Sequence, residues 1–173
     1  VGSEMCIRDR KWINRILSWE PNARIVLHGV SMGAATVLMA SGEDLPGNVK
    51  AVIADCGYTS EWDEFQREAD TLHIPWFPVL NATSVLSKVR DGYDFKQASA
   101  LAQVKKSRIP TLFIHGSSDE LVPYSMLGEL YAAAACEKEE LTVEGAGHAL
   151  SSSVAPTLYW RTVEDFIAKY LDR

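Results

Sequence analysis

Cysteines are few in this sequence and show no pairing pattern. Its 173 residues include three of them, Cys6, Cys56 and Cys136, an odd number with no two-residue spacing between any pair. This usage argues against a disulfide framework and against a structural zinc site, both of which depend on sets of cysteines or histidines at defined spacings. It is compatible with a reducing compartment, and we expect neither a metal nor a cofactor.

Basic clusters are lacking as well. Lysine and arginine number 17 against 23 acidic residues, which gives a net charge of −6 and a pI of about 5.2. An acidic chain without a basic patch does not favour nucleic acid or an anionic membrane surface as a partner, and a neutral or cationic small substrate fits it better. Repeats, low-complexity tracts and linkers are absent from the sequence, so we expect one globular unit.

The first ten residues, "VGSEMCIRDR", resemble a translated sequencing adaptor. We therefore treat residues 1–10 as a non-native segment and residues 11–173 as part of a longer protein. On this interpretation an upstream membrane anchor is not excluded, and we expect a cytoplasmic or membrane-anchored location. The sequence does not indicate the number of subunits.

From Lys11 onward the hydrophobic pattern alternates between helical and strand periods. Alternation of this kind is typical of an α/β fold with a three-layer parallel sheet. The predicted strands are residues 23–29, 48–58, 108–116 and 139–145, and the predicted helices are residues 12–19, 33–41, 123–135 and 158–171.

One insertion interrupts the alternation. Residues 57–106 contain helical patterns but no good strand, and they follow directly on the second predicted strand. An insertion at this place lies over the carboxyl ends of a parallel sheet, where α/β folds bind ligands. We therefore predict a helical cap at about residues 57–106.

The pattern Gly29-Val30-Ser31-Met32-Gly33 separates an apolar strand from an apolar helix. It fits the G-x-S-x-G nucleophile elbow, a strained turn that lifts a serine hydroxyl clear of the sheet. We expect both glycines to be required by crowding, and the backbone N–H of Met32 to point at a developing oxyanion. The alternative is that Ser31 is only a small residue in a tight turn.

A nucleophile elbow requires an acid and then a histidine further along the chain. Asp119 lies in the loop after predicted strand 108–116, and His148 lies in the loop after strand 139–145, close to two glycines. Both loops are at carboxyl ends of strands, on the same edge as Ser31. We therefore predict Ser31 as nucleophile, His148 as base and Asp119 as the acid that orients His148.

Other residues compete for these roles. Asp55 also follows a strand and is the alternative acid. We interpret His28 and His115 as structural residues, because each lies within or at the end of a strand, and His73 falls in the cap. Cys56 has no elbow around it, so we interpret it as a small buried residue.

Four segments carry a family resemblance: "LHGVSMGAATVLMASGE", "VKAVIADCGYTSEWDEF", "FKQASALAQVKKSRIPTLFIHGSSDELVP" and "GAGHA". Residues 11–173 resemble the carboxy-terminal two thirds of an α/β-hydrolase, specifically the bacterial capped serine hydrolases grouped with serine aminopeptidase-like and prolyl-oligopeptidase-like enzymes. The resemblance assigns the roles of nucleophile, acid and base to Ser31, Asp119 and His148. The sequence departs from the family at Ser117, where similar proteins often carry an additional aspartate.

The resemblance also implies that the first strands of the family, and the loop with a second oxyanion donor, lie upstream of this sequence. Strand 23–29 is then expected at the edge of a four-stranded parallel sheet whose strands follow the chain order. We expect such a fragment to be nearly inactive on its own.

The activity implied by the resemblance is hydrolysis of a small ester, with an amide or peptide as second choice, through an acyl-enzyme. The aromatic residues of the cap indicate an apolar acyl or aryl group in the substrate, although they can equally form the core of the cap itself. These residues are Trp62, Phe65, Trp76 and Phe77. The alternative function is a non-catalytic binding or scaffold protein on the same fold.

Overall fold

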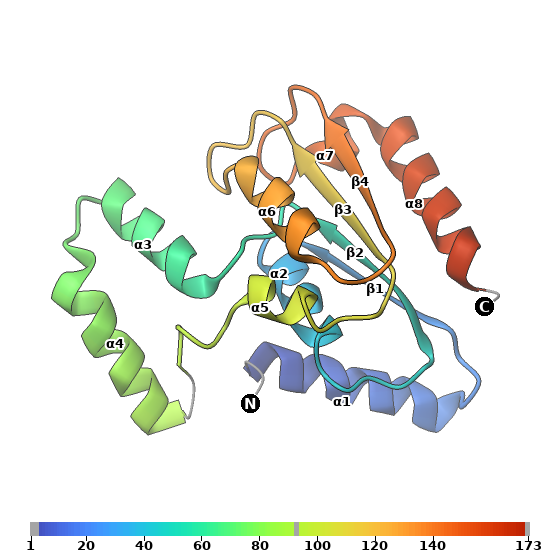
Figure 1. The fold of residues 1–173 in the computed structure, drawn as a ribbon, viewed down its shortest axis with the longest axis horizontal. Helices are drawn as coiled ribbons and strands as arrows, with labels where there is room; N and C mark the ends of the chain where they lie inside the picture. The colour runs from blue at the N-terminus through green and yellow to red at the C-terminus, as the bar shows by residue number, and fades with distance from the viewer. Residues whose placement is uncertain (1–3, 92–93, 172–173) are drawn as a thin grey trace.

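The computed structural model of the protein describes residues 4–91 and 94–171 (Figure 1). Strands and helices alternate through most of the chain. The strands are β1 (Ile25–Val30), β2 (Val49–Asp55), β3 (Thr111–Gly116) and β4 (Lys138–Val143). The helices are α1 (Glu4–Trp19), α2 (Met32–Ser41), α3 (Glu61–Thr71), α4 (Trp76–Asp91), α5 (Ala100–Val104), α6 (Ser125–Ala133), α7 (Ser151–Val154) and α8 (Pro156–Leu171).

The four strands form one parallel sheet in the order β1-β2-β3-β4. Alternate residues of each strand face opposite sides, so the sheet has two apolar faces to bury. Helices α2, α5 and α6 cover one face and share a core with Val52 and Phe113. Helix α8 covers the other face and packs on Ile53 and Ile114 (Figure 1). The predicted three-layer parallel α/β fold is confirmed.

Strand β1 lies at an edge of the sheet. It pairs with β2 on one side, and within residues 4–91 and 94–171 no strand pairs with its other side. This arrangement agrees with the predicted edge position and with the predicted chain-ordered sheet. Helix α1 packs beside it, where Ile13 meets Ile25 and Val49 in a small separate core.

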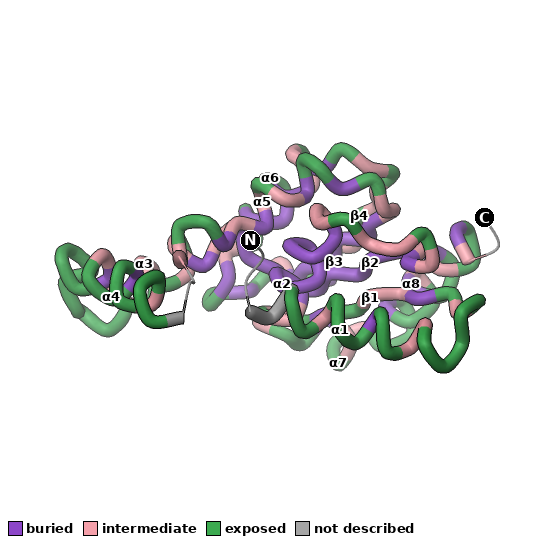
Figure 2. Tube along the Cα trace, turned by 90° about the horizontal axis from the view of Figure 1, so that it is seen from below, coloured by how far each residue is buried: buried purple, intermediate pink, exposed green. Residues whose placement is uncertain are grey.

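Helices α3, α4 and α5 lie within residues 57–106, where the sequence predicts a helical cap. Helix α5 packs on α2 and is part of the body, whereas α3 and α4 stand out from the sheet and pack mainly on each other (Figure 1). We call residues 61–91 the α3–α4 hairpin. Most of its residues are at least partly exposed, as the green tube at one end of Figure 2 shows.

Two helices differ from the sequence analysis. Helix α1 begins at Glu4, inside the segment set aside as adaptor-like, because no proline or glycine interrupts the chain between Glu4 and Trp19. The four-residue helix α7 had no sequence signal of its own. Of the helices in the described part of the chain, none combines the length and the apolar character that crossing a membrane requires.

Candidate active site

Ser31 occupies the turn between the end of β1 and the start of α2. Its backbone has φ 55° and ψ −118°, a conformation that residues other than glycine adopt rarely and only when surrounding contacts hold them. The contacts here are the Ser31 N–H, which donates to the Asp55 carbonyl at 2.8 Å, and the Ser31 carbonyl, which accepts from Ala35 N–H at 3.1 Å. The turn is strained in the way that an elbow requires.

The two glycines that flank this turn differ in how much they are needed. A Cβ added to Gly29 would lie 2.1 Å from the carbonyl oxygen of Gly33, which is a severe backbone collision. A Cβ added to Gly33 would meet no atom within 4 Å. The prediction that crowding requires both glycines is therefore correct for Gly29 and wrong for Gly33, because Gly33 turns outward on the first turn of α2.

His148 lies in the loop after β4, and its ring bridges the other two predicted residues. Its Nε2 is 2.8 Å from Ser31 Oγ, and its Nδ1 is 2.8 Å from Asp119 Oδ2. With Nδ1–H donating to the carboxylate, Nε2 is left to accept the serine proton, which is the tautomer a general base needs. The side chain of His148 is 20% exposed, so the ring can meet a substrate.

Asp119 is buried and held from several directions. Its Oδ1 accepts the backbone N–H groups of Leu121 at 3.0 Å and Val122 at 2.9 Å. Its Oδ2 faces His148 and also lies 3.2 Å from Nε2 of the buried His115, which donates to the Val122 carbonyl. The structure thus brings Ser31, His148 and Asp119 into one hydrogen-bonded chain, as the shared edge of their loops predicts.

The side chains of Asp55 and His28, two of the competing residues, have other partners. The carboxylate of Asp55 bonds Ser151 Oγ at 3.0 Å and not His148. His28 bonds the hydroxyl of Tyr159 on the far face of the sheet at 3.0 Å, and burial lowers its pKa. His73 follows Leu72, the C-cap residue of α3.

Cys56 is closer to the triad than the sequence indicates. Its sulfur and ligand atoms of Asp119 and His148 lie within 4.8 Å of one another. Burial, followed by the charge of Asp55, raises the pKa of the Cys56 thiol to about 12. A thiol with such a pKa stays protonated at neutral pH and is a poor nucleophile, so the interpretation of Cys56 as a buried small residue is retained.

Met32 is the first residue of α2, so its backbone N–H belongs to the helix-terminal groups that have no partner within the helix. This N–H and the positive end of the helix dipole lie directly beside Ser31. The position suits a group that binds negative charge developing next to the serine oxygen.

The α3–α4 hairpin approaches the triad through α3. Arg67 donates from Nη2 to the carbonyl of Leu121, two residues beyond Asp119, at 3.3 Å. One helical turn earlier, Glu64 is close enough for its charge to act on His148, and burial raises the pKa of Glu64. The sequence analysis missed both residues, because a charged side chain on a helix has no pattern that separates a site-facing position from a solvent-facing one.

The cap aromatics contact other side chains of the insertion. The ring of Trp62 carries Lys96 Nζ 4.4 Å from its centroid, the centroids of Phe65 and Phe95 lie 4.9 Å apart with tilted rings, and those of Trp76 and Phe77 lie 6.3 Å apart. Their predicted role in binding substrate stays a prediction.

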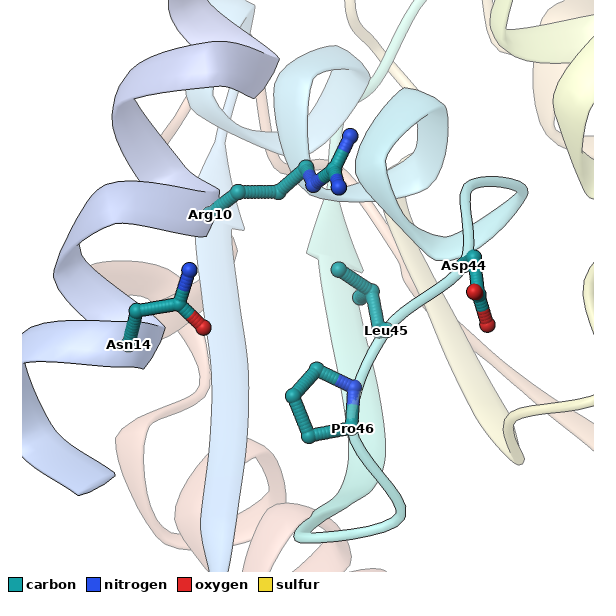
Figure 3. Close-up of a pocket in the computed structure, with 5 residues that line it drawn as sticks. All are labelled: Arg10, Asn14, Asp44, Leu45 and Pro46. Atoms are coloured by element: carbon teal, nitrogen blue, oxygen red, sulfur yellow. The ribbon is translucent and has the colours of Figure 1, made fainter.

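Cavities also occur away from the triad. One of about 260 Å³ is lined by Arg10 and Asn14 of α1 and by Asp44, Leu45 and Pro46 between α2 and β2 (Figure 3). Another of about 150 Å³ lies in the insertion, between α4 and Asp94. Neither has a triad residue in its lining, so the candidate active site is the edge that carries Ser31.

Comparison with known proteins places the chain among relatives. The profile of the prolyl oligopeptidase family matches residues 12–173. The uncharacterized protein YqkD of Bacillus subtilis is 32% identical over 146 residues, which are 83% of this chain and 47% of that protein. An α/β hydrolase domain-containing protein of Arabidopsis thaliana is 31% identical over 157 residues, which are 86% of this chain and 48% of that protein. The chain thus spans about half the length of these curated relatives.

Solved structures share the fold at low sequence identity. An esterase from Pyrococcus furiosus superposes with a TM-score of 0.75 at 19% identity, over 98% of this chain and 63% of that one. An acylaminoacyl peptidase from Pyrococcus horikoshii gives a TM-score of 0.72 at 18% identity, over 99% of this chain and 29% of that one.

Proposed function

This chain belongs to the prolyl oligopeptidase family and has the α/β-hydrolase fold, and from that premise we propose that it is a serine hydrolase that cleaves small esters through an acyl-enzyme. The single observation that carries the proposal is the hydrogen-bonded chain from Ser31 Oγ through His148 to Asp119, with 2.8 Å at each step. An amide or peptide bond is the second choice of substrate.

In the proposed acylation step, Ser31 Oγ attacks the carbonyl carbon of the ester while His148 Nε2 takes the serine proton. Asp119 holds the imidazole in the required tautomer and stabilises its cation. His148 then gives the proton to the leaving alcohol, which departs and leaves the acyl group on Ser31. In deacylation, His148 takes a proton from water while the water oxygen attacks the acyl carbon; His148 then gives the proton to Ser31 Oγ as the bond to the acyl group breaks and the carboxylic acid leaves.

The carbonyl oxygen becomes negative during both steps. The backbone N–H of Met32 supports this charge, because it stands at the amino end of α2 beside the attacking oxygen. Donors of this type act without rearrangement during the reaction, so their contribution is largest in the transition state.

Substrate selection is proposed to come from the insertion. The apolar side chains of Trp62 and Phe65 on α3 favour an apolar acyl or aryl group, with Trp76 and Phe77 on α4 as further contacts. These assignments rest on residue type and on the approach of α3 to the loop of Asp119.

The proposal is tested by the burst of p-nitrophenol that the chain releases from p-nitrophenyl butyrate. We expect one equivalent per folded chain, because acylation of Ser31 releases the alcohol even where deacylation is slow. Ser31→Ala should abolish the burst, whereas Cys56→Ala should keep most of it. A burst that survives Ser31→Ala contradicts the proposal, and no burst either from this chain or from a longer chain that also carries the upstream oxyanion donor favours the non-catalytic binding protein.

A further inference from the structure

Asp55 is a buried carboxyl group that the proposed mechanism does not use. It is the last residue of β2, between the strand that leads to Ser31 and the strand that leads to Asp119, and it is 2% exposed. Its backbone carbonyl accepts the N–H of Ser31 at 2.8 Å. The main chain of Asp55 therefore holds the strained elbow directly.

The side chain of Asp55 points toward the loop that carries His148. Its Oδ1 accepts the hydroxyl of Ser151 at 3.0 Å. Ser151 is fully buried at the start of α7, three residues beyond His148. The hydroxyl of Tyr159, on α8, donates to the same carboxyl group.

The loop between His148 and Ser151 needs such an anchor. Ala149 has φ 58°, in the left-handed region that alanine enters only at a cost. A residue held there persists only where contacts on both sides fix it. On one side His148 bonds Asp119 and Ser31, and on the other side Ser151 bonds Asp55.

We propose that Asp55 is a positioning residue that fixes the separation of Ser31 and His148, holding the first through its main chain and the second through Ser151. The inference rests on the proposed function, since the separation matters only if the two residues exchange a proton. Asp55 touches neither the triad side chains nor the reacting atoms, so it acts entirely through the two loops.

A carboxylate suits this place because it accepts two hydroxyl protons at once, from Ser151 and from Tyr159. Burial opposes the charge and raises the pKa of Asp55, while the two hydroxyl groups and the rings of His115 on β3 and His28 on β1 act in the opposite direction. Cys56 is another titratable neighbour, and its raised pKa keeps it neutral. A buried carboxyl group that bonds the loop of His148, beside the site, fits a role in geometry better than a role in stability.

The test measures labelling of Ser31 by a fluorophosphonate in the 173-residue chain, with the maximal rate separated from the half-saturating concentration. Ser151→Ala should lower the maximal rate about tenfold and change the half-saturating concentration less than twofold, because the loop of His148 is released while the reagent contacts are kept. Tyr159→Phe is the matched control, because it removes the other hydroxyl from the same carboxyl group without touching the loop. Its maximal labelling rate should stay within twofold of the wild-type rate.

Three more measurements complete the test. Asp55→Ala should lower the maximal rate as far as Ser151→Ala does, and the double variant should fall no further, since both changes break one contact. Asp55→Asn keeps an acceptor oxygen. Its decrease in the logarithm of the maximal rate should therefore be at most half of the decrease seen in Asp55→Ala. Thermal unfolding of each variant confirms that the rates refer to folded protein.

The outcomes separate the two proposals. An unlabelled wild-type chain overturns the proposed function together with this inference. A labelled wild-type chain overturns this inference alone if Ser151→Ala labels at the wild-type rate, if Tyr159→Phe loses as much as Ser151→Ala, or if the losses in the double variant add.

Discussion

The sheet edge around Ser31 and the α3–α4 hairpin are neighbours in this fold, yet their side chains are held very differently. At the sheet edge, Asp119 is buried and accepts hydrogen bonds from two backbone groups and from His148. In the hairpin, Phe77 is 66% exposed and Val89 is 80% exposed. Short loops between buried strands fix the first region, whereas two helices that pack mainly on each other form the second.

This difference shows where function is expected to be sensitive. Positions that depend on the sheet have one conformation, because any shift would disturb the core on both faces. Positions in the hairpin have few buried contacts and should tolerate change.

The largest expected effect contrasts a triad residue with an exposed residue of the hairpin. His148→Ala should lower the rate of Ser31 labelling by about 10³-fold or more, because the serine loses its base. Val89→Ala shortens a side chain that is 80% exposed on the hairpin and should change the rate less than about threefold. Equal losses in the two variants would remove the distinction between the regions.

The next contrast uses two carboxylates. Asp119→Asn should lower the labelling rate by at least about 10²-fold, because an amide can stabilise the wrong tautomer of His148. Asp94→Asn, next to the hairpin, breaks the 3.0 Å ion pair with the exposed Lys88 and should leave the rate within twofold. If Asp55→Asn proved more damaging than Asp119→Asn, the acid would have been assigned to the wrong strand end.

A third contrast lies within the elbow itself. Gly29→Ala places a methyl group against the Gly33 carbonyl and should cost about 1–3 kcal/mol in the free energy of unfolding. Gly33→Ala faces open space on a helix and should be neutral or stabilising by up to about 1 kcal/mol. Urea denaturation measures both, and a destabilised Gly33→Ala variant would contradict the open space around Gly33 on the first turn of α2.

The smallest effect concerns stability at high pH. Because the Cys56 thiol has a pKa raised to about 12, the folded state keeps a proton that the unfolded thiol loses above about pH 8.5. Stability is therefore lost as pH rises from that value toward 12. Cys56→Ala removes this loss, so its melting temperature should gain a few degrees on the wild type between pH 8 and pH 10.5.

At Asp94, next to the α3–α4 hairpin, stability depends on pH in the opposite direction. Hydrogen bonding to Lys88 lowers the pKa of Asp94, so its contribution to stability is present above its ordinary pKa and is lost as pH falls. The melting temperature of Asp94→Asn should therefore lie below that of the wild type near neutral pH and should approach it in acid.

The alkaline prediction has its own contrary outcome. It is refuted if the difference in melting temperature between Cys56→Ala and the wild type is the same at pH 8 and at pH 10.5.

The same contrast explains what the sequence could predict. Strand periodicity and the order of Ser31, Asp119 and His148 depend on local patterns and on the rule that parallel strands end at one edge, so the sheet and the grouping of these residues followed from the sequence. The need for Gly29 followed as well, but the freedom of Gly33 did not, because it depends on which way one helical turn faces.

The supporting contacts could not be predicted. Ser151 and Tyr159 reach Asp55 across 96 and 104 positions of the chain, and nothing in their neighbourhoods distinguishes them from other hydroxyl residues. Likewise, Glu64 and Arg67 are two charges among many on α3, and only the docking of that helix turns them toward the loop of Asp119. Contacts of this kind are properties of the packing, not of the local pattern.

The most direct test of the central claim is to label the folded chain with a fluorophosphonate and to locate the label by peptide mass mapping. We expect one label per chain, on Ser31, that is absent from Ser31→Ala and from chain unfolded in urea, because the hydroxyl reacts only while His148 accepts its proton. A label on another residue, or equal labelling of the folded Ser31→Ala variant, would contradict the assignment of Ser31 as the nucleophile.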